Sequence, residues 1–108
     1  MLFGKRYLIR VSGDSMYPLL KDNDLVFVNP NAYKVHLPSV DDIVVARHPY
    51  QKSTLLIKKV DSIDENDKLF LLGINKASST DSRSFGSVSK NHIKGKVVGM
   101  SKHKLRRV

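Results

Sequence analysis

The stretch from residue 42 to residue 61, DIVVARHPYQKSTLLIKKVD, carries the pattern that decides the fold. It holds two short segments rich in valine, isoleucine and leucine, residues 42–47 and 54–61, separated by turn-forming residues that begin at His48-Pro49. Short apolar segments with β-branched residues, bounded by turn chemistry, are typical of β-strands. The stretch therefore predicts two consecutive strands.

The same pattern continues on both sides of this stretch. Four more segments of this kind are predicted as strands: residues 7–11, 24–29, 68–73 and 93–100. A tight turn is expected at Asn66-Asp67, and only residues 15–20, with Pro18 near their start, favour a short helical turn. Several short strands about ten residues apart predict an all-β domain, a compact folded sheet or partly open barrel with at most short helical turns.

Length and composition predict one domain over residues 1–108, in which residues from about 101 to 108 form a basic tail. The hydrophobic fraction of 41% and the charged fraction of 27% match an ordinary globular protein. The chain has no cysteine, which excludes disulfides, thiol catalysis and Cys-based zinc sites. We expect no metal and no cofactor.

The net charge of +9 first indicates a nucleic-acid or anionic-membrane partner. No acidic residue follows Asp81, however, so much of the excess lies at the end of the chain, where a basic tail is commonly a solvated terminus. No RNA-binding signature or zinc-finger spacing is present, and we expect no nucleic-acid partner. No segment has the roughly 18 apolar residues that span a bilayer. The chain is expected to be soluble and cytoplasmic, with weak membrane contact through its basic tail left open.

The serine motif, residues 12–20 (SGDSMYPLL), is the first candidate site. A serine hydroxyl becomes a nucleophile only when a base removes its proton and donors stabilise the oxyanion that forms. Gly13 permits a tight turn ahead of Ser15, and the turn Gly13-Asp14-Ser15 can aim backbone N–H groups at one point. Taken alone, the pattern is equally typical of an ordinary turn.

The lysine strand, residues 55–60 (LLIKKV), is the second candidate site. Side chains alternate along a strand, so Lys58 and Lys59 point to opposite faces. Lys58 shares its face with apolar residues, whereas Lys59 can pair with Asp61 and stay charged. Burial among apolar side chains lowers the pKa of a lysine, which favours Lys58 as a general base. The alternative is an edge strand whose exposed lysines discourage aggregation.

The third motif, residues 73–86 (GINKASSTDSRSFG), is polar and bracketed by glycines. Asp81 and Arg83 are two residues apart and are expected to form an ion pair that orders the loop. The alternative is a flexible, serine-rich loop.

Together the three motifs resemble the signal peptidase I family of serine/lysine endopeptidases. The resemblance rests on Ser15-Met16-Tyr17-Pro18, on Ile57-Lys58-Lys59, and on the third motif from Gly73 to Gly86, and it runs in order from about residue 8 to residue 99. Within that family the chain is most similar to a small, anchorless subgroup, the maturation proteases of nickel-type superoxide dismutase.

The resemblance implies the role of each site residue. Ser15 would be the nucleophile, Lys58 the general base, Ser79 the hydroxyl that orients the base, and Asp81 with Arg83 a structural ion pair. It also implies an N-terminal leader of a precursor polypeptide, bound in extended form, as the substrate.

Three departures from the family pattern bear on the site. Leu19 follows Pro18 where the family usually has threonine, Gly13 replaces an oxyanion-stabilising serine of some members, and Ile74 replaces the usual aspartate.

Three other functions are considered. They are a general leader peptidase held at the membrane by Lys102 to Arg107, a self-cleaving repressor, and a non-catalytic basic binding module. Repressors of that kind need a DNA-binding domain and a cleavable linker ahead of the serine. Because fourteen residues precede Ser15, we do not expect this function.

Overall fold

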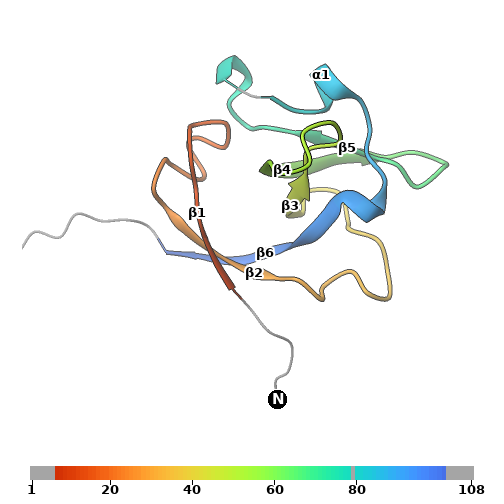
Figure 1. Ribbon diagram of the computed structural model, residues 1–108, viewed down its shortest axis with the longest axis horizontal. Helices are drawn as coiled ribbons and strands as arrows, with labels where there is room; N and C mark the ends of the chain where they lie inside the picture. Colours follow the sequence, from red (N-terminus) through yellow and green to blue (C-terminus); the bar gives the residue numbers. More distant parts are fainter. Residues whose placement is uncertain (1–6, 79, 102–108) are drawn as a thin grey trace, which may run out of the picture.

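The computed structural model describes residues 7–78 and 80–101, which form one six-stranded sheet. The strands are β1 (Tyr7–Arg10), β2 (Leu25–Asn29), β3 (Ile43–Arg47), β4 (Leu55–Ile63), β5 (Leu69–Leu72) and β6 (Ile93–Ser101). They lie in the order β1-β2-β6-β3-β4-β5 with every neighbouring pair antiparallel. The sheet coils strongly but does not close into a barrel (Figure 1). The predicted all-β fold is confirmed.

All six predicted strands are present, with ends that differ from the prediction by at most two residues. The helical segments are short: two 3₁₀ helices, η1 (Lys76–Ser78) and η2 (Lys90–His92), and one helix, α1 (Ser82–Phe85). The helical turn predicted at residues 15–20 is instead a run of hydrogen-bonded turns that contains the cis peptide bond Tyr17–Pro18. The expected tail at 101–108 lies outside the described residues except for Ser101, which ends β6.

Two clusters of buried side chains form the core. The first contains Met16 and Leu20 of the serine motif, packed against the buried valines Val11, Val26, Val28, Val45 and Val97. The second lies under β3, β4 and β5. Met16 and Leu20 are almost fully buried, and burying a side chain of this size contributes about 1.5–3 kcal/mol. The first cluster therefore anchors the serine motif to the sheet.

The outer edge of β5 is covered by the third motif and the residues that follow it. The Leu71 N–H donates to Ser82 Oγ (2.9 Å), and the Gly73 N–H donates to Asp81 Oδ2 (2.8 Å). Val88 continues the cover with a bridge to the first residue of β5. Because side chains and backbone of this segment satisfy the edge, β5 does not offer its N–H groups to a further strand.

Candidate active site

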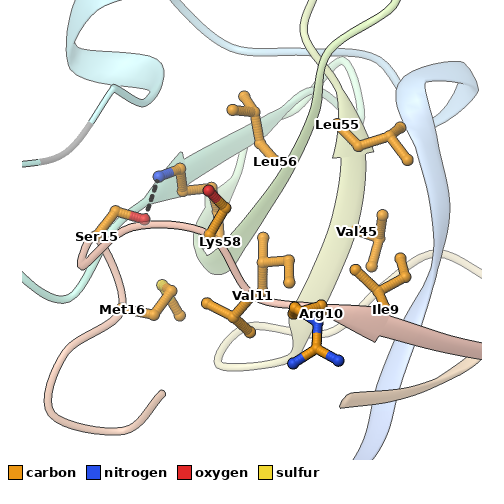
Figure 2. Close-up of a pocket in the computed structure, with 11 residues that line it drawn as sticks. Ile9, Arg10, Val11, Ser15, Met16, Val45, Leu55, Leu56 and Lys58 are labelled. Atoms are coloured by element: carbon orange, nitrogen blue, oxygen red, sulfur yellow. Dashed lines mark hydrogen bonds between the residues drawn. The ribbon is translucent and has the colours of Figure 1, made fainter. Parts of the chain in front are cut away.

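Ser15 and Lys58 meet at one end of the sheet. Lys58 Nζ donates a hydrogen bond to Ser15 Oγ over 2.8 Å, although 43 residues separate the two in sequence. Figure 2 shows the two side chains pointing toward one another, with Met16, Val11 and Leu56 beside them. The structure thus brings together the two residues that the sequence singled out for nucleophile and base.

Lys58 lies on β4 opposite Val44 of β3, and its side chain is 2% exposed. The predicted burial of Lys58 is confirmed. Removal from water lowers the pKa of Lys58, because a charged ammonium loses solvation there. The negative charge of Asp81 raises that pKa, and the positive charge of Arg83 lowers it again. The balance leaves Lys58 closer to its neutral form, which is the form that accepts a proton.

Lys59 points away from the site and is 39% exposed. Its ion pair is with Asp41 (3.6 Å), which corrects the predicted pairing with Asp61. The strand register shifts between Val60 and Ser62, so Asp61 is the extra residue of a β-bulge and no longer follows the simple alternation. Asp41, by contrast, precedes β3 and reaches Lys59 from the neighbouring strand.

The turn that carries Ser15 is held by contacts on both sides. Gly13 has a φ of 87°, a conformation that favours glycine, and its N–H donates to Asp22 Oδ1 (2.8 Å). On the other side, Asn75 donates its backbone N–H to the Ser15 carbonyl (2.8 Å) and its side-chain Nδ2 to the Asp14 carbonyl (3.0 Å). The sequence assigned no role to Asn75. Asn75 belongs to the motif from Gly73 to Gly86, but its contacts with the serine turn could not be predicted, because both partners lie about sixty residues away.

An ion pair between Asp81 and Arg83 orders the third motif next to the site. Arg83 donates Nε to Asp81 Oδ1 (3.0 Å) and Nη2 to Asp81 Oδ2 (2.6 Å), and Asp81 is 1% exposed. Asp81 also accepts the Arg83 N–H and so begins α1, which ends at Gly86 with a φ of 86°. An aspartate cap and a terminal glycine are recognisable in sequence and were the available signal for this helix. Ser79 lies outside the described residues, so its role as the orienting hydroxyl stays a prediction.

A cavity of about 140 Å³ opens beside the Ser15–Lys58 pair. One wall comes from β1 and the residues after it and the other from the first half of β4, and Met16 and Val45 also line the cavity (Figure 2). Most lining side chains are apolar: Ile9, Val11, Met16, Val45, Leu55, Leu56 and Ile57. In the described part of the chain, no group of three or more His, Asp or Glu side chains is placed to hold a metal ion.

An open antiparallel sheet carries a serine and a buried lysine in hydrogen-bonding contact, an arrangement that a serine-type peptidase can use. The comparison with family models agrees: the model described as Peptidase S24-like matches residues 3–98. The chain belongs to the Peptidase S24-like family, which supports a serine peptidase function in general and the predicted resemblance at the level of the broader S24 and signal peptidase I-like family. A search of curated proteins returned no match. Among the described residues, no helix is both long and apolar enough to cross a bilayer.

Proposed function

We propose that this chain is a serine endopeptidase in which Ser15 is the nucleophile and Lys58 the general base. The observation that carries the proposal is the 2.8 Å contact between Lys58 Nζ and Ser15 Oγ at the edge of an apolar cavity. A lysine in water has a pKa of about 10.4 and stays protonated at neutral pH. Burial of Lys58 lowers its pKa and so increases the fraction of molecules that hold a free amine next to the hydroxyl.

The reaction follows from this contact. Neutral Lys58 takes the proton of the Ser15 hydroxyl while Oγ attacks the carbonyl carbon of the scissile peptide bond. The tetrahedral intermediate collapses as protonated Lys58 returns that proton to the departing amine, and an ester between Ser15 and the N-terminal fragment remains. Lys58 then takes a proton from a water molecule whose oxygen attacks the ester, and it returns this proton to Ser15 Oγ as the ester bond breaks. The N-terminal fragment leaves as a carboxylic acid, which ionises in water, and Ser15 and neutral Lys58 are regenerated.

Among the described strands, β1 is paired with β2 alone, so the first wall of the cavity offers a strand edge to an extended substrate. The Val11 N–H donates to the Asp24 carbonyl (2.7 Å), so Val11 directs its backbone groups toward the β2 side. By alternation, Arg10 and Ser12 direct theirs outward, toward the cavity that they line. A peptide lying along this edge gains main-chain hydrogen bonds without depending on its own side chains.

The opposite wall offers a second edge, because in the described part of the chain the first half of β4 is paired with β3 alone. The His48 N–H donates to the Thr54 carbonyl (2.9 Å), which places the backbone groups of Thr54 on the β3 side. By the same alternation, Leu55 and Ile57 direct their backbone groups away from β3, and β5 pairs with β4 only from Lys59 onward. Two edges therefore face one cavity, and a polypeptide in extended form between them would pass Ser15.

We further propose that the substrate is a precursor protein from which an N-terminal leader is removed, with the precursor of a nickel-type superoxide dismutase as the first candidate. The support is the resemblance of the three motifs to that subgroup of maturation proteases. The alternatives are a general leader peptidase acting at a membrane surface and a non-catalytic basic binding module.

The test is cleavage of that precursor, and of a library of unstructured peptides, by wild type, Ser15→Ala, Lys58→Ala and Lys59→Ala. We expect the first two variants to lower the cleavage rate by about 10³-fold or more. Lys59→Ala is the matched control: it removes a neighbouring lysine whose exposed ion pair contributes little, and the rate should stay within about twofold. If Ser15→Ala and Lys58→Ala cleave like wild type, the peptidase proposal is wrong.

The same assay separates the substrates. Cleavage of library peptides without cleavage of the superoxide dismutase precursor would contradict only the narrower assignment. Cleavage that requires anionic lipid vesicles and falls with salt would favour the leader peptidase at a membrane surface. Incubation of the chain alone, analysed for new termini, tests self-cleavage as in the self-cleaving repressors.

A further inference from the structure

Asn75 holds two successive peptide groups of the turn that carries Ser15. Its backbone N–H contacts the Ser15 carbonyl at 2.8 Å, and its side-chain Nδ2 contacts the Asp14 carbonyl at 3.0 Å. The side-chain oxygen of Asn75 accepts the Ala77 N–H (3.3 Å), which fixes the direction in which the amide nitrogen points. The neighbouring Ile74 packs against the first core cluster, and this packing holds the backbone at Asn75 in place.

These contacts fix the direction of the N–H groups of the turn. A trans peptide unit is planar, and its carbonyl and its N–H point to opposite sides. The Asp14 carbonyl accepts both Asn75 Nδ2 (3.0 Å) and the Tyr17 N–H (3.1 Å). The Ser15 N–H of the same peptide unit therefore points away from Asn75. The Ser15 carbonyl is held in the same way, which directs the Met16 N–H. Across the described residues, neither of these two N–H groups has a hydrogen-bond partner.

A peptidase that uses Ser15 needs donors of this kind. When Oγ attacks, negative charge develops on the substrate carbonyl oxygen, and N–H groups already aimed at that position stabilise the transition state. Gly13 offers no side chain at the place where some relatives have a serine, and its own N–H is already donated to Asp22. Among the N–H groups of this turn that have no partner in the described residues, those of Ser15 and Met16 are the nearest along the chain to the proposed nucleophile.

We infer that Asn75 is a positioning residue of the proposed peptidase: by holding the carbonyls of Asp14 and Ser15, it aims the Ser15 and Met16 N–H groups at the developing oxyanion. The inference rests on the proposed function and extends it to a residue outside the nucleophile and base. Asn75 itself touches neither the substrate nor the reacting atoms.

Two variants separate the donor from the rest of the side chain. Asn75→Asp keeps the size and the acceptor for the Ala77 N–H, but it replaces the donor to Asp14 by a carboxylate oxygen. Asn75→Ala removes the donor without adding a charge. Asn31→Asp is the matched control, because it makes the same chemical change in an exposed loop of the chain.

The readout is kcat and KM for cleavage of the superoxide dismutase precursor, or of the best library peptide, together with the pH profile and the Tm. We expect both Asn75 variants to lower kcat by about 10–100-fold. Removing an oxyanion donor lowers kcat by about 10²–10³-fold, and a donor N–H that is still present but points in a less favourable direction should lower it less. KM should change by about twofold or less, since the ground-state carbonyl uses these donors weakly. Asn31→Asp should match wild type in every measurement.

The pH profile distinguishes aiming from an effect on Lys58. If Asn75→Ala shifts the acidic limb of the profile without lowering the plateau, Asn75 acts through the base and the inference is wrong. Unchanged kcat in both variants, or failure of both to fold, also overturns it, the latter by assigning Asn75 to the stability of the fold. The proposed function is judged separately by Ser15→Ala: if that variant is inactive while the Asn75 variants keep full kcat, only the inference about Asn75 falls.

Discussion

Arg83 binds both carboxylate oxygens of Asp81, through Nε at 3.0 Å and through Nη2 at 2.6 Å. The two partners act on Lys58 in opposite directions, because Asp81 raises the pKa of the lysine and Arg83 lowers it. Asp81 also accepts the Gly73 N–H and so holds the end of β5 next to the site. The ion pair therefore orders the third motif while placing little net charge beside the proposed base.

Loss of Arg83 should raise the pKa of Lys58, since the lowering effect of its charge disappears and that of Asp81 remains. For the proposed peptidase, only the neutral lysine is active, so activity rises with pH through this pKa. The acidic limb of the kcat/KM profile of Arg83→Gln should therefore move to higher pH, with much of the activity recovered in alkali. Lys34→Gln removes an exposed positive charge elsewhere and serves as the control. An unmoved limb, or one moved to lower pH, would contradict the prediction.

Replacing the buried lysine by an apolar residue should stabilise the fold. The folded-state pKa of Lys58 is below its ordinary value, so at neutral pH the unfolded chain holds this proton more tightly than the folded chain does. We expect Lys58→Met to raise the free energy of unfolding at pH 7 by about 0.5–2 kcal/mol while it abolishes cleavage. The gain should be largest below the folded-state pKa of Lys58 and shrink as pH rises toward the ordinary lysine value. Urea unfolding between pH 6 and pH 10 measures it, and a loss of stability at pH 7 would count against it.

Gly95 of β6 packs tightly against the end of β2 and the residue after it. A Cβ atom added there would lie 2.6 Å from Val28 Cγ1 and 2.9 Å from the Asn29 carbonyl oxygen. Gly95→Ala should therefore destabilise the fold by about 1–3 kcal/mol, the usual cost of overpacking. Gly99→Ala in the same strand is the control, because its nearest atom would be Phe27 Cδ2 at 3.5 Å, an ordinary contact. Thermal unfolding should give a clearly lower Tm for Gly95→Ala than for Gly99→Ala. Equal Tm values would contradict the prediction.

Asp42 should make the fold sensitive to acid. Burial raises the pKa of Asp42, but hydrogen bonds from the Ser39 N–H and the Tyr33 hydroxyl, with the charge of Lys96, more than offset this and leave the pKa below its ordinary value. A carboxylate with a lowered pKa stabilises the folded state above its unfolded-state pKa of about 3.9, and this contribution is lost as pH falls through the folded-state value. Asp42→Asn should cost about 1–2 kcal/mol at pH 6 and little at pH 2. A difference between the two proteins that stays constant with pH would contradict this assignment.

Local pattern predicted the strands of this protein accurately. Their alternating, β-branched segments are short-range signals, and the turn residues between them limit where each strand can end. Alternation also indicated which of the two adjacent lysines is buried. The alternation rule failed one residue beyond Val60, because Asp61 is the extra residue of a β-bulge and its side chain no longer follows the alternation. Asp41, which precedes the neighbouring strand β3, then binds Lys59.

By itself the sequence determined the all-β class, the burial of Lys58 and the three motifs, because each depends on residues that are close together along the chain. Only the tertiary structure decided that Ser15 lies 2.8 Å from Lys58, that Asn75 holds the serine turn, and that residues of β1 and β4 line one cavity. These relationships depend on the strand order β1-β2-β6-β3-β4-β5, in which neighbours in space are distant in sequence. Strand order is set by how the coiled sheet buries two clusters at once, a property of the whole chain that no single segment encodes.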